Sequence, residues 1–164
     1  MAILHQKEAR LEQIKEALRF MEKAIGLEDI NPDYWYILGD TYVKAERNED
    51  AIEAYRKVSE LDPHNSEIWI DFAEVYVSED RMDEACNILD KGMESNPKNA
   101  SYIYRNALYL IKSGRKQEAL SLIGKALDMD FARNTELFDY MPQLKNDDHL
   151  ISLIETFRVN KNSR

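Results

Sequence analysis

Residues 35–63 read WYILGDTYVKAERNEDAIEAYRKVSELDP, and this stretch decides the fold. Its anchors, in chain order, are Trp35, Leu38, Gly39, Tyr42, Ala51, Tyr55 and Pro63. Trp35, Leu38 and Tyr42 stand at i, i+3 and i+7, so they share one face of a helix. The alanine and tyrosine that follow predict a second helix, and the proline, which lacks a backbone N–H, marks its end. The stretch therefore predicts a helix–turn–helix unit.

The anchors recur downstream at a period of 34 residues. Trp69 follows Trp35 at this distance, and Pro97 follows Pro63. The alanines at the same spacing are Ala51, Ala85 and Ala119. Several anchors kept in phase over three periods indicate an internal repeat, because chance would have to succeed at every position together.

Gly39 and Ala51 have a packing role in this pattern. Both are small residues, and we expect them to face each other where the two helices approach closely. One helix pair cannot bury its apolar face alone, whereas stacked pairs share a continuous core. We therefore predict an all-α stack of about eight or nine helices, most of about 12–14 residues, without any β-sheet.

Composition limits the classes of partner and compartment. The 164 residues include 22 Lys and Arg against 31 Asp and Glu, a net charge of −9 that disfavours a nucleic-acid or anionic-membrane partner. The single cysteine, Cys86, rules out an intramolecular disulfide. No apolar run approaches a membrane span, and residues 1–11 are too polar for the core of a signal peptide. We expect a cytoplasmic protein without membrane insertion.

The register divides the chain into three full repeats and two end segments, which we expect to form a single solenoid domain. The full repeats are residues 32–65, 66–99 and 100–133. Residues 1–31 predict a helix from about Leu4 to Ile25 that stops at Gly26 and matches the second half of a repeat. Its expected apolar stripe consists of Leu11, Ile14, Leu18, Met21 and Ile25. This helix is either a cap or a remnant of a longer array.

Start and stop signals agree with the register. Asn31 and Asn65 are expected N-caps, Pro32 suits the first helical position, and Gly114 marks the turn inside the third repeat.

Residues 134–164 form the most degenerate segment. Leu137 and Phe138 open a short helix that Pro142 ends, and a second helix is expected from about Asp148 to Phe157. We expect this pair of helices to cap the third repeat, with residues 160–164 frayed.

The pattern resembles the tetratricopeptide repeat family, strongly over residues 32–133 and weakly at both ends. The resemblance implies a right-handed superhelix of helix pairs, whose first helices line a concave groove that holds an extended or helical peptide. The groove positions it implies are the second, fifth, ninth and twelfth of each repeat: Asp33, Tyr36, Asp40, Val43, Glu67, Ile70, Glu74, Val77, Ser101, Tyr104, Leu108 and Ile111.

One branch of this family grips a peptide's C-terminal carboxylate with a clamp of lysine, asparagine and arginine. The matching residues here are Tyr36, Asp40, Asp71 and Arg105, so only the arginine is kept. We therefore do not expect binding of a terminal carboxylate. Asp71 and Arg105 join the candidate groove residues.

Residues that could carry chemistry are scattered along the sequence. His5, His64 and His149 lie far apart, and we expect all three at the surface. Cys86 follows Ala85 on a packed helix, so we expect a small buried hydrophobe rather than a reactive thiol. No Cys/His spacing for zinc is present. We expect no catalytic residue, no metal and no cofactor.

The acidic groove positions have two interpretations. The acids are Asp33, Asp40, Glu67, Asp71 and Glu74. They form either a solvated helix face or a negative wall of the groove, with Tyr104 and Leu108 of the third repeat as a more neutral, apolar floor.

The function expected from these patterns is a protein–protein interaction scaffold that binds a protein or peptide segment with basic and apolar residues. A small chaperone for secreted proteins is the first alternative, and an enzyme is a less favoured one. No nucleic-acid partner is expected. The ends of the stack are a candidate surface for pairing between copies of the chain.

Overall fold

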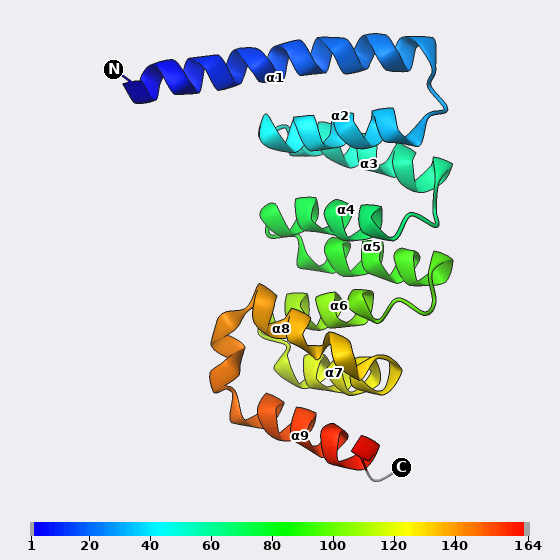
Figure 1. Ribbon diagram of the computed structural model, residues 1–164, viewed down its shortest axis with the longest axis vertical. Coiled ribbons are helices and arrows are strands. Elements are labelled where there is room, and N and C mark those ends of the chain that lie inside the picture. Colours follow the sequence, from blue (N-terminus) through cyan, green and yellow to red (C-terminus); the bar gives the residue numbers. More distant parts are fainter. Residues whose placement is uncertain (1, 163–164) are drawn as a thin grey trace. The chain divides into compact units, whose positions relative to one another are not determined.

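The computed structural model describes residues 2–162, and every regular element in that range is a helix (Figure 1). The elements are α1 (Ala2–Leu27), α2 (Pro32–Lys44), α3 (Asn48–Leu61), α4 (Ser66–Ser78), α5 (Met82–Ser95), α6 (Ala100–Lys112), α7 (Lys116–Met129), the 3₁₀-helix η1 (Phe131–Asn134), α8 (Thr135–Tyr140), the 3₁₀-helix η2 (Pro142–Asn146) and α9 (Asp148–Asn162). Helices α2 to α7 have 13 or 14 residues each. The predicted all-α helical-repeat solenoid is confirmed.

An asparagine starts the first helix of each repeat. The side-chain oxygens of Asn31, Asn65 and Asn99 accept hydrogen bonds from the backbone N–H two residues later, at 3.0, 3.1 and 3.2 Å. Each bond satisfies one of the N–H groups that a helix start leaves without a partner. The caps predicted at Asn31 and Asn65 are confirmed, and Asn99 follows at the same spacing.

The turn between the two helices of each repeat requires a left-handed residue. The backbone angle φ is +59° at both Glu46 and Asp80, and +79° at Gly114. These residues share one repeat position, and only the glycine adopts this angle without a steric penalty from a Cβ atom. An arginine follows each turn and pairs with an acid three residues later: Arg47 with Asp50, Arg81 with Glu84 and Arg115 with Glu118.

The chain divides into two compact units, Met1–Glu79 and Asp80–Arg164. In the first unit α1 packs on α2, α2 on α3, and α3 on α4. One core of this unit joins Leu18 and Met21 of α1 to Leu38 of α2 and Ala54 of α3. Figure 1 shows that the first turns of α1 extend beyond the end of α2.

Helix α1 differs from its prediction in two respects. Gly26 is not a stop, because the helix continues to Leu27 and the N–H of Glu28 still donates to the carbonyl of Ala24 at 3.0 Å. Leu11 of the expected apolar stripe is 50% exposed. Leu18 and Met21 of the same stripe are buried as expected.

Gly39 allows the close helix approach that we expected. A Cβ atom on Gly39 would lie 2.5 Å from Cε1 and 2.6 Å from Cδ1 of Tyr55. The atoms nearest to Gly39 therefore belong to Tyr55, one helical turn after Ala51 on α3. Tyr55 and Ala51 are both buried.

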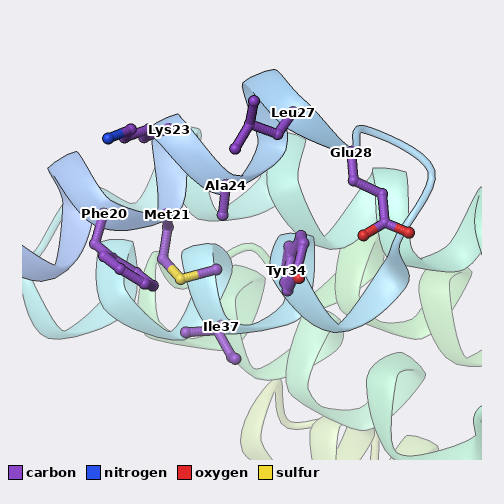
Figure 2. A pocket seen from close by; sticks show the side chains of 8 residues that line it. All are labelled: Phe20, Met21, Lys23, Ala24, Leu27, Glu28, Tyr34 and Ile37. Atoms are coloured by element: carbon purple, nitrogen blue, oxygen red, sulfur yellow. The ribbon is translucent and has the colours of Figure 1, made fainter.

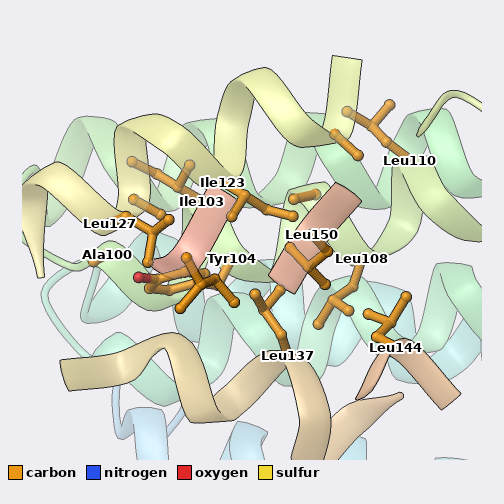
Figure 3. Close-up of a cluster of buried hydrophobic side chains, with 14 residues drawn as sticks. Ala100, Ile103, Tyr104, Leu108, Leu110, Ile123, Leu127, Leu137, Leu144 and Leu150 are labelled. Carbon is orange, nitrogen blue, oxygen red and sulfur yellow. The ribbon is translucent and has the colours of Figure 1, made fainter. Parts of the chain in front are cut away.

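In the second unit the C-terminal segment packs on α6 and α7 (Figure 3). Leu137 of α8, Leu144 of η2 and Leu150 of α9 are buried in one hydrophobic cluster with Tyr104 of α6 and Ile123 of α7. The residues expected to cap the third repeat therefore share its core.

Helix α8 ends before Pro142 as predicted, whereas α9 is longer than predicted. It continues past Phe157 to Asn162, so residues 160–162 are helical rather than frayed. Arg158 pairs with Glu155 at 2.8 Å, and the Lys161 ammonium lies 5.6 Å from the centre of the Phe131 ring. These contacts hold the last turns, and residues 163 and 164 lie outside the described part of the chain.

None of the helices in the described residues combines the length and the apolar character needed to cross a membrane.

Candidate functional site

Nine of the candidate groove residues lie in the first unit, on α2 and α4. Their spacing of three or four residues places them on one face of each helix. We call this set the α2/α4 surface: Asp33, Tyr36, Asp40, Val43, Glu67, Ile70, Asp71, Glu74 and Val77. Asp33, Val43 and Glu67 are exposed, and the other members are half-buried.

Two tyrosines and two aspartates form a hydrogen-bonded cluster at this surface. The hydroxyl of Tyr36 on α2 donates to Asp71 on α4 at 2.5 Å, and the hydroxyl of Tyr55 on α3 donates to Asp40 on α2 at 2.6 Å. The two tyrosine rings are tilted, with centres 5.9 Å apart. We call these four residues the acidic–tyrosine cluster. Because its bonds join three helices, the cluster positions the first two repeats relative to each other.

Negative charge accumulates around the cluster. Burial raises the pKa of the Asp71 carboxyl group, and three neighbouring carboxylates raise it further: Asp40, Glu67 and Glu74. The hydrogen bond from Tyr36 acts in the opposite direction. Burial also raises the pKa of both cluster tyrosines, with a further contribution from their bonded aspartates. The tyrosines are therefore neutral donors at physiological pH.

Tyr55 is a cluster residue that the sequence patterns named as a repeat anchor but not as a candidate groove residue. It occupies a core position of the repeat and is buried, but its hydroxyl also orients Asp40. The sequence does distinguish this position by residue type. The matching positions of the later repeats hold Leu89 and Ile123, whose side chains carry no polar atom, whereas Tyr55 carries a hydroxyl.

The corresponding positions of the second unit are covered by the chain itself. Ser101, Tyr104 and Leu108 of α6 are buried, and α8 packs on this helix. The Ser101 hydroxyl donates to Glu136 of α8 at 2.9 Å, and the Tyr104 hydroxyl donates to the backbone carbonyl of Asp130 at 3.0 Å. The apolar floor expected from Tyr104 and Leu108 thus lies beneath the C-terminal segment rather than at the surface.

The last two candidates of the second unit are also engaged by this segment. The Arg105 guanidinium stacks on the Tyr140 ring, with its Cζ atom 4.3 Å from the ring centre, and Lys112 lies 5.3 Å from the same ring. Ile111 packs against the hydrophobic cluster of the unit. The one residue kept from the carboxylate clamp therefore contacts an aromatic ring of its own chain.

The residues considered for chemistry are three histidines and one cysteine. All three histidines are exposed: His5, His64 and His149. Cys86 is half-buried rather than buried, and burial raises the pKa of its thiol to about 11. Within residues 2–162 no group of three or more His, Cys, Asp or Glu side chains could hold a metal ion.

Comparisons with known proteins agree with the geometry. One crystal structure of a MamA protein has a TM-score of 0.64 and 20% identity over 74% of this chain and 67% of that chain. A second MamA structure has a TM-score of 0.64 and 17% identity over 96% of both chains. YrrB, described as a TPR protein with an unusual peptide-binding site, has a TM-score of 0.59 and 18% identity over 91% of this chain and 80% of that chain. At these identities the similarity shows a shared fold.

A comparison with curated protein sequences finds no match. Two family models, both described as tetratricopeptide repeat, match residues 8–66 and 42–108. Their matches overlap at residues 42–66, which lie almost entirely in the first full repeat. The chain belongs to the tetratricopeptide repeat family.

Proposed function

We propose that the α2/α4 surface binds a protein segment that carries Lys or Arg next to an apolar residue. The acidic–tyrosine cluster supports this proposal, because the carboxylates near Asp71 repel one another and a cation between them would relieve that repulsion. Half-buried Tyr36 and Ile70 offer apolar contact area beside the acids. The net charge of −9 has the same sign and would speed the approach of a basic partner.

Binding without catalysis is the role that suits these groups best. The proteins that share this fold include YrrB, which has a peptide-binding site, and this favours a peptide as the ligand class. The affinity should be modest, on the order of micromolar, because ordering a flexible segment offsets part of the contact energy. The acids should act mainly on the association rate, and salt should screen them.

The test uses short labelled peptides in a Gly/Ser background. One carries lysines around a single tryptophan, and the other has glutamates in place of the lysines. We expect the purified chain to bind the lysine peptide and to discriminate against the glutamate peptide, measured by fluorescence anisotropy at low and high salt. Equal binding of the two peptides would contradict the proposal.

Two double variants with the same charge change locate the site. Asp33→Lys with Glu67→Lys reverses two exposed acids of the α2/α4 surface. Glu53→Lys with Glu60→Lys reverses two exposed acids of α3 and serves as the control. We expect the first variant to weaken binding severalfold at low salt and less at high salt, and the control to have a small effect. Equal losses in both variants would show that only net charge matters.

A further inference from the structure

An apolar groove lies between α1 and α2, apart from the α2/α4 surface (Figure 2). Its volume is about 720 Å³, and its apolar lining comes from Phe20, Met21, Ala24 and Leu27 of α1 and from Tyr34 and Ile37 of α2. In Figure 2 Phe20 and Met21 project from α1 toward Ile37. Phe20 is 70% exposed, although it is among the largest apolar side chains of the helix.

The repeat period shows which kind of element covers this face elsewhere. The residues 34 positions after Phe20 and Ala24 are Ala54 and Val58, and each is only 1% exposed. Both lie on α3, against which the first helix of the same repeat packs. An antiparallel helix therefore belongs on the matching face of α1.

In this chain the residues that would form that helix continue α1 instead. The left-handed turn residue of the first full repeat is Glu46, and the position 34 residues earlier is Glu12. Helix α1 runs through Glu12 without a break from Ala2 to Leu27. Within the described residues, no helix takes the place of the first helix of this half-repeat, and the groove stays open.

We propose that a second copy of the chain fills this place, with the two α1 helices antiparallel and each lying in the α1–α2 groove of the other. A two-fold axis beside Phe20 pairs each residue of one α1 helix with a residue of the other α1 helix. The numbers of two paired residues then add to about 40. Glu16 then lies beside Lys23 of the second copy, and this pair forms twice. Ala17 lies beside Ala24, and these small side chains leave room for both Phe20 rings.

Charge selects the antiparallel arrangement. A parallel pair of α1 helices would place Glu16 beside Glu16 and Lys23 beside Lys23, which is unfavourable. The antiparallel pair replaces both repulsions by attractions and matches the direction in which the two helices of a repeat run. Because one helix and its groove form a small interface, we expect a dimer with a Kd on the order of micromolar.

Sedimentation velocity of the full chain over a range of concentrations tests the proposal. We expect a concentration-dependent monomer–dimer equilibrium for the wild type. Phe20→Glu should remove the dimer, whereas Val159→Glu, which changes a 61% exposed residue of α9, should leave it unchanged. Far-UV circular dichroism of both variants checks that the helices remain folded.

A charge exchange tests the register of the pairing. Glu16→Lys and Lys23→Glu should each weaken the dimer by about tenfold, because each places like charges together twice. The double variant should recover the wild-type affinity, since the pairs re-form with the signs exchanged. A wild type that is monomeric at all concentrations, a dimer that persists in Phe20→Glu, or a double variant no tighter than either single variant would each overturn the proposal. A monomer that instead binds an amphipathic helix of another protein in this groove would overturn it as well.

Discussion

A methyl group added at Gly39 should destabilise the first unit, and shortening Tyr55 should relieve the effect. The new Cβ atom would lie 2.5 Å from Cε1 of Tyr55, whereas ordinary contact begins at 3.4 Å, so the ring must move by almost 1 Å. The ring is confined, because its hydroxyl is bonded to Asp40 and its centre lies 5.9 Å from that of Tyr36 and 6.3 Å from that of Phe72. The clash therefore cannot be removed by a small rotation.

The expected magnitude follows from two opposing effects. Overpacking of a filled core costs about 1–3 kcal/mol, and the better helix propensity of alanine returns about 1 kcal/mol. Gly39→Ala should therefore lower the free energy of unfolding by up to about 2 kcal/mol. Tyr55→Leu alone should cost about 2–3 kcal/mol through the lost hydrogen bond and the cavity.

The later repeats show that alanine is accepted when the aromatic ring is absent. At the two matching positions the second repeat has Ala73 with Leu89, and the third has Ala107 with Ile123. The Gly39→Ala, Tyr55→Leu double variant should therefore be more stable than the sum of the single effects predicts, by about 1–2 kcal/mol.

Urea unfolding followed by far-UV circular dichroism measures these differences. Gly26→Ala is the matched control, because a Cβ atom at Gly26 meets nothing within 4 Å. It should raise the free energy of unfolding by up to about 1 kcal/mol through helix propensity alone. The packing argument is refuted if Gly39→Ala is as stable as Gly26→Ala, or if the two single effects simply add in the double variant.

Three further predictions concern a turn, a buried carboxyl group and the C-terminal segment. Glu46→Gly should stabilise the protein by about 0.5–1 kcal/mol and Gly114→Ala should destabilise it by about 1–2 kcal/mol, because both positions have positive φ. Thermal unfolding would contradict this if the two variants changed the stability in the same direction. Asp71→Asn should stabilise the fold at neutral pH, because the raised pKa of Asp71 means that stability is lost as the pH rises through that pKa. The gain in stability should shrink in acid, and a gain that is independent of pH in urea titrations would show that the charge is not the cause. Leu137→Ala, at a fully buried site of α8, should cost about 2–4 kcal/mol, against less than about 1 kcal/mol for Leu61→Ala at a 38% exposed site; equal urea midpoints would show that α8 contributes little to the core.

Much of the fold was determined by the sequence because the repeat is local and periodic. Trp35, Ala51 and Pro63 recur in phase, so helix bounds and the caps Asn31 and Asn65 could be predicted from spacing alone. The acids of the α2/α4 surface could be placed on one helix face for the same reason. These features depend on neighbours within one helical turn or one period.

Other features were decided only by the tertiary structure. The Tyr55 ring lies against Gly39, because the contact distance between two packed helices depends on their relative position, which the repeat period does not specify. Tyr104 and Leu108 lie beneath α8, because the degenerate C-terminal segment packs on α6 through contacts that follow no repeat. The open groove beside Phe20 exists because α1 continues as one helix where a turn would otherwise bring a covering helix back. In each case the outcome depends on which apolar surfaces meet in space, and a one-dimensional pattern of anchors does not specify this.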